Sequence, residues 1–287
     1  MTPEIINGRI IAEKIKKQLT TELNSLKKQY DIYPKVVTIK VGHDPSSELY
    51  LKLRDQACKK VGIHTEHRNY EANITQDQLL TTIQGLNLDP TIHGIMVQYP
   101  LPSHISQHTI IQSITPTKDI EGLHPHNLGQ LLIQKDTLTP CTPQAIMHIL
   151  DHEKITLQGK NIVIINHSNI VGKPLSIMCL NKNATVIICH EFTTNLTQYT
   201  TTADILISAT GIPHFITADH IKNNSILIDV GIVQTKNGIT GDFDRSSVDD
   251  KAQKITPVPG GVGPVTIASA INNMVKIIRT RCHNQTQ

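Results

Sequence analysis

The sequence predicts an α/β protein with two domains. Short apolar runs, as long as buried strands, alternate along the chain with segments whose apolar residues recur every three or four positions. This alternation is typical of parallel sheets covered by helices. The length of 287 residues exceeds that of one ordinary domain, and prolines punctuate the middle of the chain. We therefore expect a domain boundary within residues 120–145.

The first half of the chain contains three predicted helices and two predicted strands. Apolar residues at helical spacing predict a first helix over residues 11–26. A β-branched run over residues 36–41 predicts a buried strand, and a second helix follows over residues 49–61. A third helix over residues 79–86 precedes a strand-like segment at residues 92–98. Strand and helix thus alternate, which favours a parallel sheet.

The second half contains four nearly continuous apolar runs, as expected for central strands that are covered on both faces. These predicted strands are residues 162–165, 185–189, 205–208 and 226–230. A segment rich in proline and glycine at residues 256–264 cannot form regular structure. Beyond it, apolar residues at helical spacing predict a final helix over residues 268–278.

Composition excludes several classes of protein. Lys and Arg number 27 against 24 Asp and Glu, and this near-neutral balance argues against a nucleic-acid partner. Five widely spaced cysteines without a CxxC pair argue against a disulfide framework and favour a reducing cytoplasm. No apolar run approaches the roughly 20 residues that span a bilayer, and charges interrupt the apolar N-terminal stretch, unlike a signal peptide. We expect a cytoplasmic protein with no membrane partner.

The predicted strand at residues 162–165 runs into a polar turn with one glycine, Gly172, and then a helix. Such a unit presents backbone N–H groups to a pyrophosphate. The usual GxGxxG pattern is absent, so this turn alone is equally compatible with an ordinary connection. Glu191 ends the next strand, 19 residues after Gly172, where an acidic side chain typically accepts a hydrogen bond from a ribose. The alternative is a solvated loop carboxylate.

Histidines occur in two pairs at helical i,i+4 spacing, His104/His108 and His148/His152. Such pairs can ligate zinc on a helix. Neither pair adjoins an HExxH glutamate or a set of cysteine ligands, so we interpret both as solvated or capping residues and expect no metal.

Several segments taken together resemble the bifunctional methylenetetrahydrofolate dehydrogenase/cyclohydrolase (FolD) family, from near residue 5 to about residue 279. The most specific of them is Pro257-Val-Pro-Gly-Gly-Val-Gly-Pro264. The other segments are residues 41–50, 57–63, 93–102, 116–122 with Asn127 and Gly129, 140–143, 168–174, 203–204, 229–232 and 241–242.

The resemblance implies two α/β domains around a cleft, the second a Rossmann-like dinucleotide-binding domain, with the C-terminal helix returning to the first domain. We place the folate-binding catalytic domain at residues 1–140 with helix 265–287, and the NAD(P)-binding domain at residues 141–264. The implied cofactor is NADP or NAD, the substrates are tetrahydrofolate derivatives, and the implied assembly is a homodimer. Oxidation of 5,10-methylene-tetrahydrofolate gives the 5,10-methenyl form, which water converts to 10-formyl-tetrahydrofolate.

The resemblance also assigns roles to individual residues. Tyr50 matches the tyrosine that stacks on the aminobenzoate ring, and Gln98 matches the glutamine that positions the reacting centre. Glu121 occupies the position of an acid that holds the pterin. The predicted catalytic residues are Tyr50, Arg54, Gln98 and Glu121. The predicted substrate-binding residues are Tyr50, Gln98, Pro100, Leu101, Asp119, Glu121, Pro259, Gly260, Gly261 and Pro264. The predicted cofactor-binding residues are Asn166, His167, Ser168, Ile170, Gly172, Glu191, Thr210, Gly211 and Ile232.

Two departures from the family pattern concern the chemistry. Arg54 stands where the family has its catalytic lysine, and arginine does not lose its proton in proteins. Lys52 is no substitute, since it lies about 200° around the helix from position 54. We therefore predict weak cyclohydrolase activity with measurable dehydrogenase activity. Glu121 replaces an aspartate, which keeps the carboxylate and adds a methylene.

Two further departures concern the cofactor. His167 replaces a frequent arginine and Glu191 a frequent serine, and those two positions commonly contact the 2′-phosphate of NADP. A carboxylate there repels the phosphate, so we predict a shift toward NAD. One rival hypothesis is a catalytically degenerate paralogue. Another, an oxidoreductase for a different small substrate, is less favoured because Tyr50, Gln98 and residues 257–264 are all present.

Overall fold

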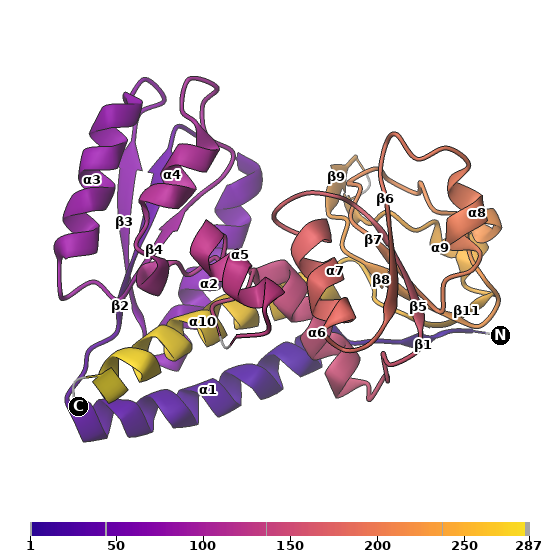
Figure 1. Ribbon diagram of the computed structural model, residues 1–287, viewed down its shortest axis with the longest axis horizontal. Helices are drawn as coiled ribbons and strands as arrows, with labels where there is room; N and C mark the ends of the chain where they lie inside the picture. The colour runs from indigo at the N-terminus through magenta and orange to yellow at the C-terminus, as the bar shows by residue number, and fades with distance from the viewer. Residues whose placement is uncertain (1, 44, 136, 237, 285–287) are drawn as a thin grey trace. The chain divides into compact units, whose positions relative to one another are not determined.

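The computed structural model describes residues 2–43, 45–135, 137–236 and 238–284, and it divides into two compact units. Unit 1 comprises residues 1–13 and 142–266, and unit 2 comprises residues 14–141 and 267–287 (Figure 1). The prediction that residues 1–13 belong to the first domain was wrong. Strand β1 (Glu4–Ile5) pairs in parallel with β11 (Ala252–Ile255), so the start of the chain completes the sheet of unit 1.

Unit 2 contains a three-stranded parallel sheet in the order β3-β2-β4. Its strands are β3 (His64–Tyr70), β2 (Lys35–Val41) and β4 (Gly94–Val97). Strand β3 was not predicted, because its sequence HTEHRNY is polar and it lies at the edge of the sheet, where only β2 pairs with it.

The two faces of this sheet pack against different sets of helices, because alternate side chains of a strand point to opposite faces. Val36 and Met96 belong to a core cluster that also contains residues of α1, α2 and α10. Val37 and Ile95 belong to a second cluster with α3 and α4. Thr38 follows the parity of Val36 and therefore faces α2. The helices are α1 (Gly8–Tyr30), α2 (Pro45–Val61), α3 (Gln76–Leu88), α4 (Gln107–Ser113), the 3₁₀ turn η1 (Pro116–Lys118), α5 (Pro125–Leu132) and α10 (Val262–Asn284).

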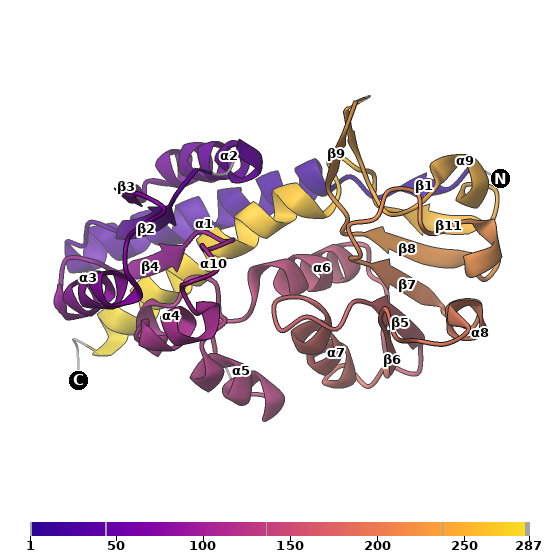
Figure 2. The ribbon, with the colours of Figure 1, turned by 90° about the horizontal axis from the view of Figure 1, so that it is seen from above.

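Helices α1 and α10 are the longest of the described elements, and their portions in unit 2 lie side by side (Figures 1 and 2). Leu23 of α1 and Ile271 and Val275 of α10 share one core cluster, and Arg279 forms an ion pair with Glu22. The final helix thus packs into unit 2.

Unit 1 contains a six-stranded sheet in the order β1-β11-β8-β7-β5-β6, and every pairing is parallel. The neighbours of β5 are β6 and β7, so the strand order reverses direction at β5, which is the place where open α/β sheets bind their ligands. The remaining strands of this sheet are β5 (Asn161–Ile165), β6 (Thr185–Cys189), β7 (Ile205–Ser208) and β8 (Ser225–Asp229).

The helices of unit 1 are shorter than α1 and α10. Unit 1 also contains a small antiparallel hairpin that was not predicted. The helical elements are α6 (Cys141–His152), α7 (Gly172–Leu180), α8 (Leu196–Thr200), η2 (Ala218–His220) and α9 (Arg245–Val248). The hairpin consists of β9 (Val233–Thr235) and β10 (Gly238–Thr240). Among the described residues, no helix combines the length and apolar character that a membrane span requires. The five cysteines are buried and free.

Candidate active site

Arg54 is a fully buried cation on the face of α2 that packs on the sheet of unit 2. Its side chain is 0% exposed, and Nη2 donates to Thr38 Oγ1 at 2.6 Å and to Asp55 Oδ1 at 3.1 Å. Nη1 contacts the sulfur of Met96. Thr38 and Met96 lie on the face of β2 and β4 toward α2, so the sheet register creates this pocket for the guanidinium. The only charged partner among these contacts is Asp55.

Tyr50, Arg54 and Glu121 lie within electrostatic reach of one another. Burial raises the pKa of Glu121 to about 7, while Arg54 opposes that rise and Asp119 adds to it. The pKa of Tyr50 is raised well above its usual value, first by burial and then by the charge of Glu121. Tyr50 is half-buried and packs on the core cluster beneath α2. The predicted catalytic residues Tyr50, Arg54 and Glu121 are therefore brought together.

Three buried polar atoms of this region have no hydrogen-bond partner among the described residues. They are Arg54 Nε, Gln98 Oε1 and Glu121 Oε1. Gln98 follows β4, and its amide Nε2 donates to the Tyr99 carbonyl at 2.8 Å, which leaves Oε1 unpaired. Buried polar groups are almost always paired in folded proteins, so three unpaired atoms on predicted catalytic residues indicate groups that await a ligand.

Other predicted substrate residues of unit 2 lie on neighbouring segments. Pro100 and Leu101 follow Gln98 in an irregular segment after a cis Tyr99–Pro100 bond; Pro100 is exposed and Leu101 half-buried. The Asp119 carboxylate is already surrounded by donors: Oδ1 accepts from Gly122 N at 3.0 Å, and Oδ2 accepts from His124 N at 2.8 Å and Asn127 Nδ2 at 3.0 Å. Asp119 therefore shapes the loop that carries Glu121.

The C-terminal helix fixes that loop from its other side. Asn273 of α10 donates to the carbonyl oxygens of Ile120 and Thr139, both at 2.8 Å. Neither Asn273 nor Thr38 was predicted as a site residue. No sequence signal could have found them, because each acts through a partner that is far away in the chain.

In unit 1, Asn166 organises the loop between β5 and α7. Its Oδ1 accepts from Ser168 N at 2.9 Å, Ser168 Oγ at 2.7 Å and Gly172 N at 3.0 Å, while Nδ2 donates to the Ala209 carbonyl at 2.8 Å. A Cβ atom at Gly172 would lie 1.9 Å from the Asn166 carbonyl oxygen, so only glycine fits there. The N–H groups of the first turn of α7 are already paired or absent, since Gly172 N donates to Asn166 Oδ1, Lys173 N donates to the Ser168 carbonyl and Pro174 has none. In the loop itself, the N–H groups of Asn169 and Ile170 make no hydrogen bond to another described residue, and these two groups fit an anion such as a dinucleotide pyrophosphate. Ile170, also in this loop, is 36% exposed.

Two aspartates hold together the carboxyl ends of β7 and β8. Asp242 Oδ2 accepts from Ser208 Oγ and from Thr210 N, both at 2.7 Å. Asp229 accepts from the backbone of Gly231, Asp242 and Phe243, and burial raises its pKa to about 7. The predicted cofactor residues of this edge follow: Thr210 is half-buried, and Gly211 and Ile232 are exposed. Both aspartates lie in segments that resemble the family, but neither was predicted as a site residue.

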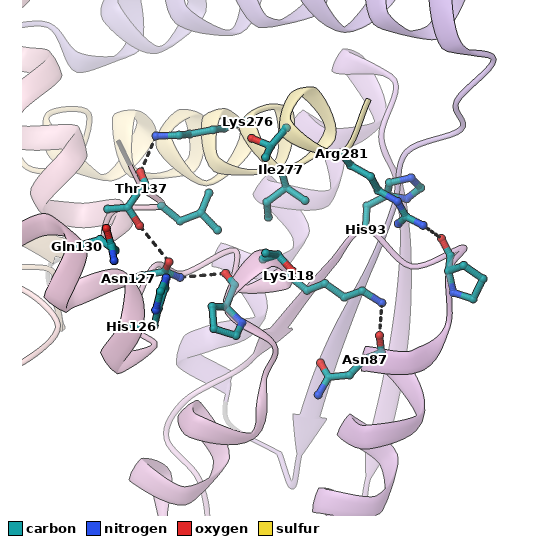
Figure 3. A pocket seen from close by; sticks show the side chains of 15 residues that line it. Asn87, His93, Lys118, His126, Asn127, Gln130, Thr137, Lys276, Ile277 and Arg281 are labelled. Atoms are coloured by element: carbon teal, nitrogen blue, oxygen red, sulfur yellow. Dashed lines mark hydrogen bonds between the residues drawn. The ribbon is translucent and has the colours of Figure 1, made fainter. Parts of the chain in front are cut away.

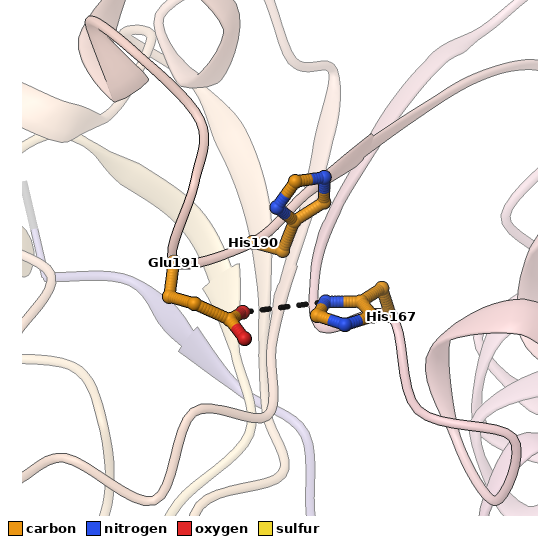
Figure 4. A group of neighbouring side chains, drawn as sticks. All are labelled: His167, His190 and Glu191. Carbon is orange, nitrogen blue, oxygen red and sulfur yellow. Dashed lines mark ion pairs between the residues drawn. The ribbon is translucent and has the colours of Figure 1, made fainter.

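His167 and Glu191 lie side by side at the carboxyl ends of β5 and β6, with His190 beside them (Figure 4). His167 Nδ1 is 3.4 Å from a Glu191 carboxylate oxygen, and the two histidine rings meet edge to face with centroids 4.7 Å apart. Among the described residues this trio has the spacing of a possible metal site, with ligand atoms within 4.8 Å of one another. His190 Nδ1 accepts from Phe192 N at 3.2 Å. His190 was not predicted as a site residue.

Residues 257–261 form a loop of unit 1, but α10 begins at Val262, so the prediction that residues 256–264 contain no regular structure was wrong for residues 262–264. A Cβ atom at Gly8 would lie 1.8 Å from the Gly261 carbonyl oxygen, so the start of α1 touches this loop. Gly260 has a φ of 108°, and Gly261 is buried. Pro259 is exposed, and Pro264 is half-buried in the first turn of α10. These predicted substrate residues belong to unit 1, whereas Tyr50 and Glu121 belong to unit 2.

A dinucleotide-dependent α/β enzyme is the class of protein that these features define. They are the six-stranded parallel sheet, the glycine-closed loop before α7, and the unpaired polar atoms of Arg54 and its neighbours. Residues 6–121 match the catalytic domain of tetrahydrofolate dehydrogenase/cyclohydrolase, and residues 140–282 match the NAD(P)-binding domain of the same family. The chain belongs to the tetrahydrofolate dehydrogenase/cyclohydrolase family. The predicted family, fold class and enzyme class are thereby confirmed.

Relatives cover nearly the whole chain. Proteins named bifunctional protein FolD from Methanosarcina barkeri and Bacillus subtilis are each 43% identical, over 96% of this chain and 96% and 98% of their own lengths. The crystal structure of the FolD enzyme from Campylobacter jejuni has a TM-score of 0.94 at 42% identity and covers 96% of this chain and 99% of that one. A FolD structure from Trypanosoma brucei, complexed with NADP and an inhibitor, has a TM-score of 0.93 at 32% identity, covering 98% and 99%. The alternative of a degenerate paralogue has no support in these comparisons.

Proposed function

We propose that this protein oxidises 5,10-methylene-tetrahydrofolate with NAD(P)⁺ and hydrolyses the 5,10-methenyl product to 10-formyl-tetrahydrofolate, the second step being slow. The observation that carries the proposal is the set of three unpaired buried atoms, Arg54 Nε, Gln98 Oε1 and Glu121 Oε1, of which the first and the last belong to residues within electrostatic reach of Tyr50. An unpaired buried polar atom costs free energy, and a polar ligand would recover it.

The residues divide the work as follows. Tyr50 offers an aromatic face to the folate ring system. Glu121, as a carboxylate, accepts parallel N–H donors of the pterin. Gln98 Oε1 is a further acceptor beside the reacting carbon. Oxidation moves a hydride from the methylene carbon to the nicotinamide, which supplies the acceptor carbon; this step depends mainly on positioning.

Hydrolysis places a different demand on the site. Water adds to the methenyl carbon, one C–N bond of the ring opens, and a proton is released. A group that exchanges protons near neutral pH assists such a step. Arg54 remains protonated, so it can orient the substrate and stabilise negative charge but cannot accept the proton. Glu121, whose pKa is raised to about 7, titrates in the right range but is engaged as a pterin ligand.

The loop closed by Gly172 would hold the pyrophosphate of the cofactor, and Glu191 and His167 would hold its adenosine ribose. Glu191 is 63% exposed on its side chain and 3.4 Å from His167 Nδ1, so its carboxylate is available to ribose hydroxyls. The same carboxylate repels a 2′-phosphate, although solvent and the neighbouring histidines weaken that repulsion. We therefore assign a preference for NAD over NADP.

An absorbance assay of purified protein tests the proposal in three arms: methylene-tetrahydrofolate with NAD, the same substrate with NADP, and methenyl-tetrahydrofolate alone. Turnover in the NAD arm with near-background hydrolysis supports both the activity and the effect of Arg54. Fast hydrolysis that is lost on Arg54→Ala would contradict the assigned effect of Arg54. No turnover with either cofactor would refute the dehydrogenase assignment.

The proposal extends to assembly and location. The family resemblance supports a homodimer, which light scattering of the purified protein would detect as twice the chain mass of 31.8 kDa. Five buried free thiols support a reducing compartment such as the cytoplasm. Fractionation of cells that express the tagged chain tests the location, and recovery in an oxidising compartment would contradict it.

A further inference from the structure

Unit 2 contains a cavity of about 640 Å³ (Figure 3). Neither Arg54 nor Tyr50 is among the described residues that line it. The last turns of α10 form one wall, and the others are formed by η1, α5, residues 137–138, and the end of α3 with the residues after it. The described residues that line it include Lys118, Lys276, Arg281, His93 and His126, and no aspartate or glutamate is among them. A cavity lined by bases without acids is suited to an anion.

Two cations of the cavity, Lys118 and Arg281, donate hydrogen bonds to backbone carbonyl oxygens, which are neutral acceptors. Lys118 Nζ donates to the carbonyl oxygens of Leu86, Asn87 and Asp89 at 2.8, 2.7 and 2.8 Å. Arg281 donates to the carbonyl oxygens of Pro90 and Ile92. The carbonyl groups take all three N–H donors of Lys118 and two of the five N–H donors of Arg281, and they do not cancel the positive charge of either side chain.

The positive charge of Arg281 opposes protonation of the other basic groups in the cavity. Burial, and after it the charge of Arg281, lowers the pKa of His93 to about 4, so this imidazole is neutral at physiological pH. Burial and Arg281 also lower the pKa of Lys118, which Asp89 partly offsets. A multivalent anion between Lys118 and Arg281 would relieve this repulsion.

Further donors line the cavity without a partner. Among the described residues, the side chains of His126, Gln130 and Thr280 make no hydrogen bond to another group of the protein. In Figure 3, Gln130 and His126 project from α5 on one side, and Arg281 and Lys276 project from α10. An amide, a hydroxyl and an imidazole can each donate to an oxyanion.

We propose that this cavity binds a small multivalent anion, a phosphorylated or polycarboxylated metabolite, between Arg281 and Lys118 with Gln130 as a further donor. Its volume falls within the range of small-molecule sites and exceeds the size of one phosphate ion. The N–H donors of Arg281 that remain suit phosphate and carboxylate oxygens alike, whereas Lys118 attracts the anion through its charge alone. This site is independent of the folate chemistry proposed above, because its lining contains none of the residues assigned there.

Isothermal titration calorimetry with pyrophosphate and with citrate, at one low ionic strength, tests the site and distinguishes the two chemistries. The wild-type chain should bind at least one of them with one-to-one stoichiometry. Arg281→Gln and Gln130→Glu should each weaken binding about tenfold or more, because each removes a charge-assisted contact or adds repulsion. Gln130→Glu tests the site even if Arg281→Gln fails to fold. The side chain of Gln130 is half-buried and makes no hydrogen bond to another described side chain, so its replacement should not disturb the fold.

The matched control is Arg279→Gln, two residues from Arg281 on α10. Arg279 pairs with Glu22 and does not line the cavity, so its loss changes the net charge equally and should leave binding unchanged. No binding of either anion to the wild-type chain would overturn the proposal. Equal weakening by Arg279→Gln, or unchanged binding in both cavity variants, would assign the binding to general charge or to another site, and would overturn it as well.

Discussion

Replacing Arg54 by lysine restores a group that can exchange protons at the centre of the proposed hydrolytic step. The guanidinium is 0% exposed and reaches Thr38 Oγ1 at 2.6 Å and Asp55 Oδ1 at 3.1 Å through the same nitrogen. A shorter, unforked ammonium keeps at most part of this arrangement. We expect the free energy of unfolding to fall by about 1–3 kcal/mol, the cost of leaving a buried polar group unpaired.

Although Arg54→Lys should lower the stability, it should raise the rate of hydrolysis. A positioned acid–base group contributes about 10²–10⁴-fold to a proton-transfer step, so Arg54→Lys should raise the rate of methenyl-tetrahydrofolate hydrolysis by about 10²-fold. That gain corresponds to about 2.7 kcal/mol of activation free energy. Oxidation of methylene-tetrahydrofolate should change by less than about tenfold, because hydride transfer depends on positioning.

Stopped-flow absorbance follows both reactions, and urea titration measures stability. Arg68→Lys is the matched control: Arg68 lies on β3, is 51% exposed on its side chain and pairs with Glu66, so both rates and the stability should stay unchanged. A folded Arg54→Lys protein whose hydrolysis rate equals that of the wild type would refute the reasoning, and so would a fall in hydrolysis together with oxidation.

Three further predictions concern titration and the cofactor. Burial raises the pKa of Glu121 to about 7, so the affinity for methylene-tetrahydrofolate should rise with pH between about 6 and 8 as the carboxylate forms, and Glu121→Gln should flatten that profile; an unchanged profile in the variant would count against it. Asp229 also has a pKa of about 7 in the folded protein, above its unfolded value near 3.9, so its proton stabilises the fold below pH 4 and that contribution is lost as the pH rises to 7. Asp229→Asn should reduce the slope of unfolding free energy against pH in this window by up to about 1.4 kcal/mol per unit, and an identical slope would exclude the assignment. His167→Arg combined with Glu191→Ser should move the ratio of kcat/KM for NADP over NAD upward about tenfold or more, whereas a ratio that stays constant would show that these side chains do not contact the ribose.

Secondary structure was predictable wherever the apolar pattern was strong. The runs at residues 162–165 and 205–208 became central strands because strands buried on both faces are apolar throughout. Strand β3 was missed because it is a polar edge strand, and β1 was missed because two residues carry no periodicity. Strand β1 also decided the domain to which the first 13 residues belong, which depends on a pairing with β11, some 250 residues away.

In the candidate site, too, the residue types were predictable from the sequence, whereas the contacts between residues far apart in the chain were not. The sequence alone indicated that Arg54 replaces a lysine and that Glu121 follows Asp119 by two residues. It did not indicate that three donors already occupy the Asp119 carboxylate, or that Arg54 is held by Thr38. Both facts depend on the register of β2 and on the path of the loop after η1, and neither leaves a local pattern.

By itself, the sequence determined the α/β class, the strands and helices of strong periodicity, the family and the residue types at the reacting centre, because these are encoded in local pattern and residue chemistry. The tertiary structure decided which groups meet: His190 with His167 and Glu191, Asn273 with the Ile120 carbonyl, and Arg281 with the cavity beside Lys118. Such meetings are set by packing between elements far apart in the chain, where a hydrogen bond or a cavity depends on distances in space that sequence spacing does not contain.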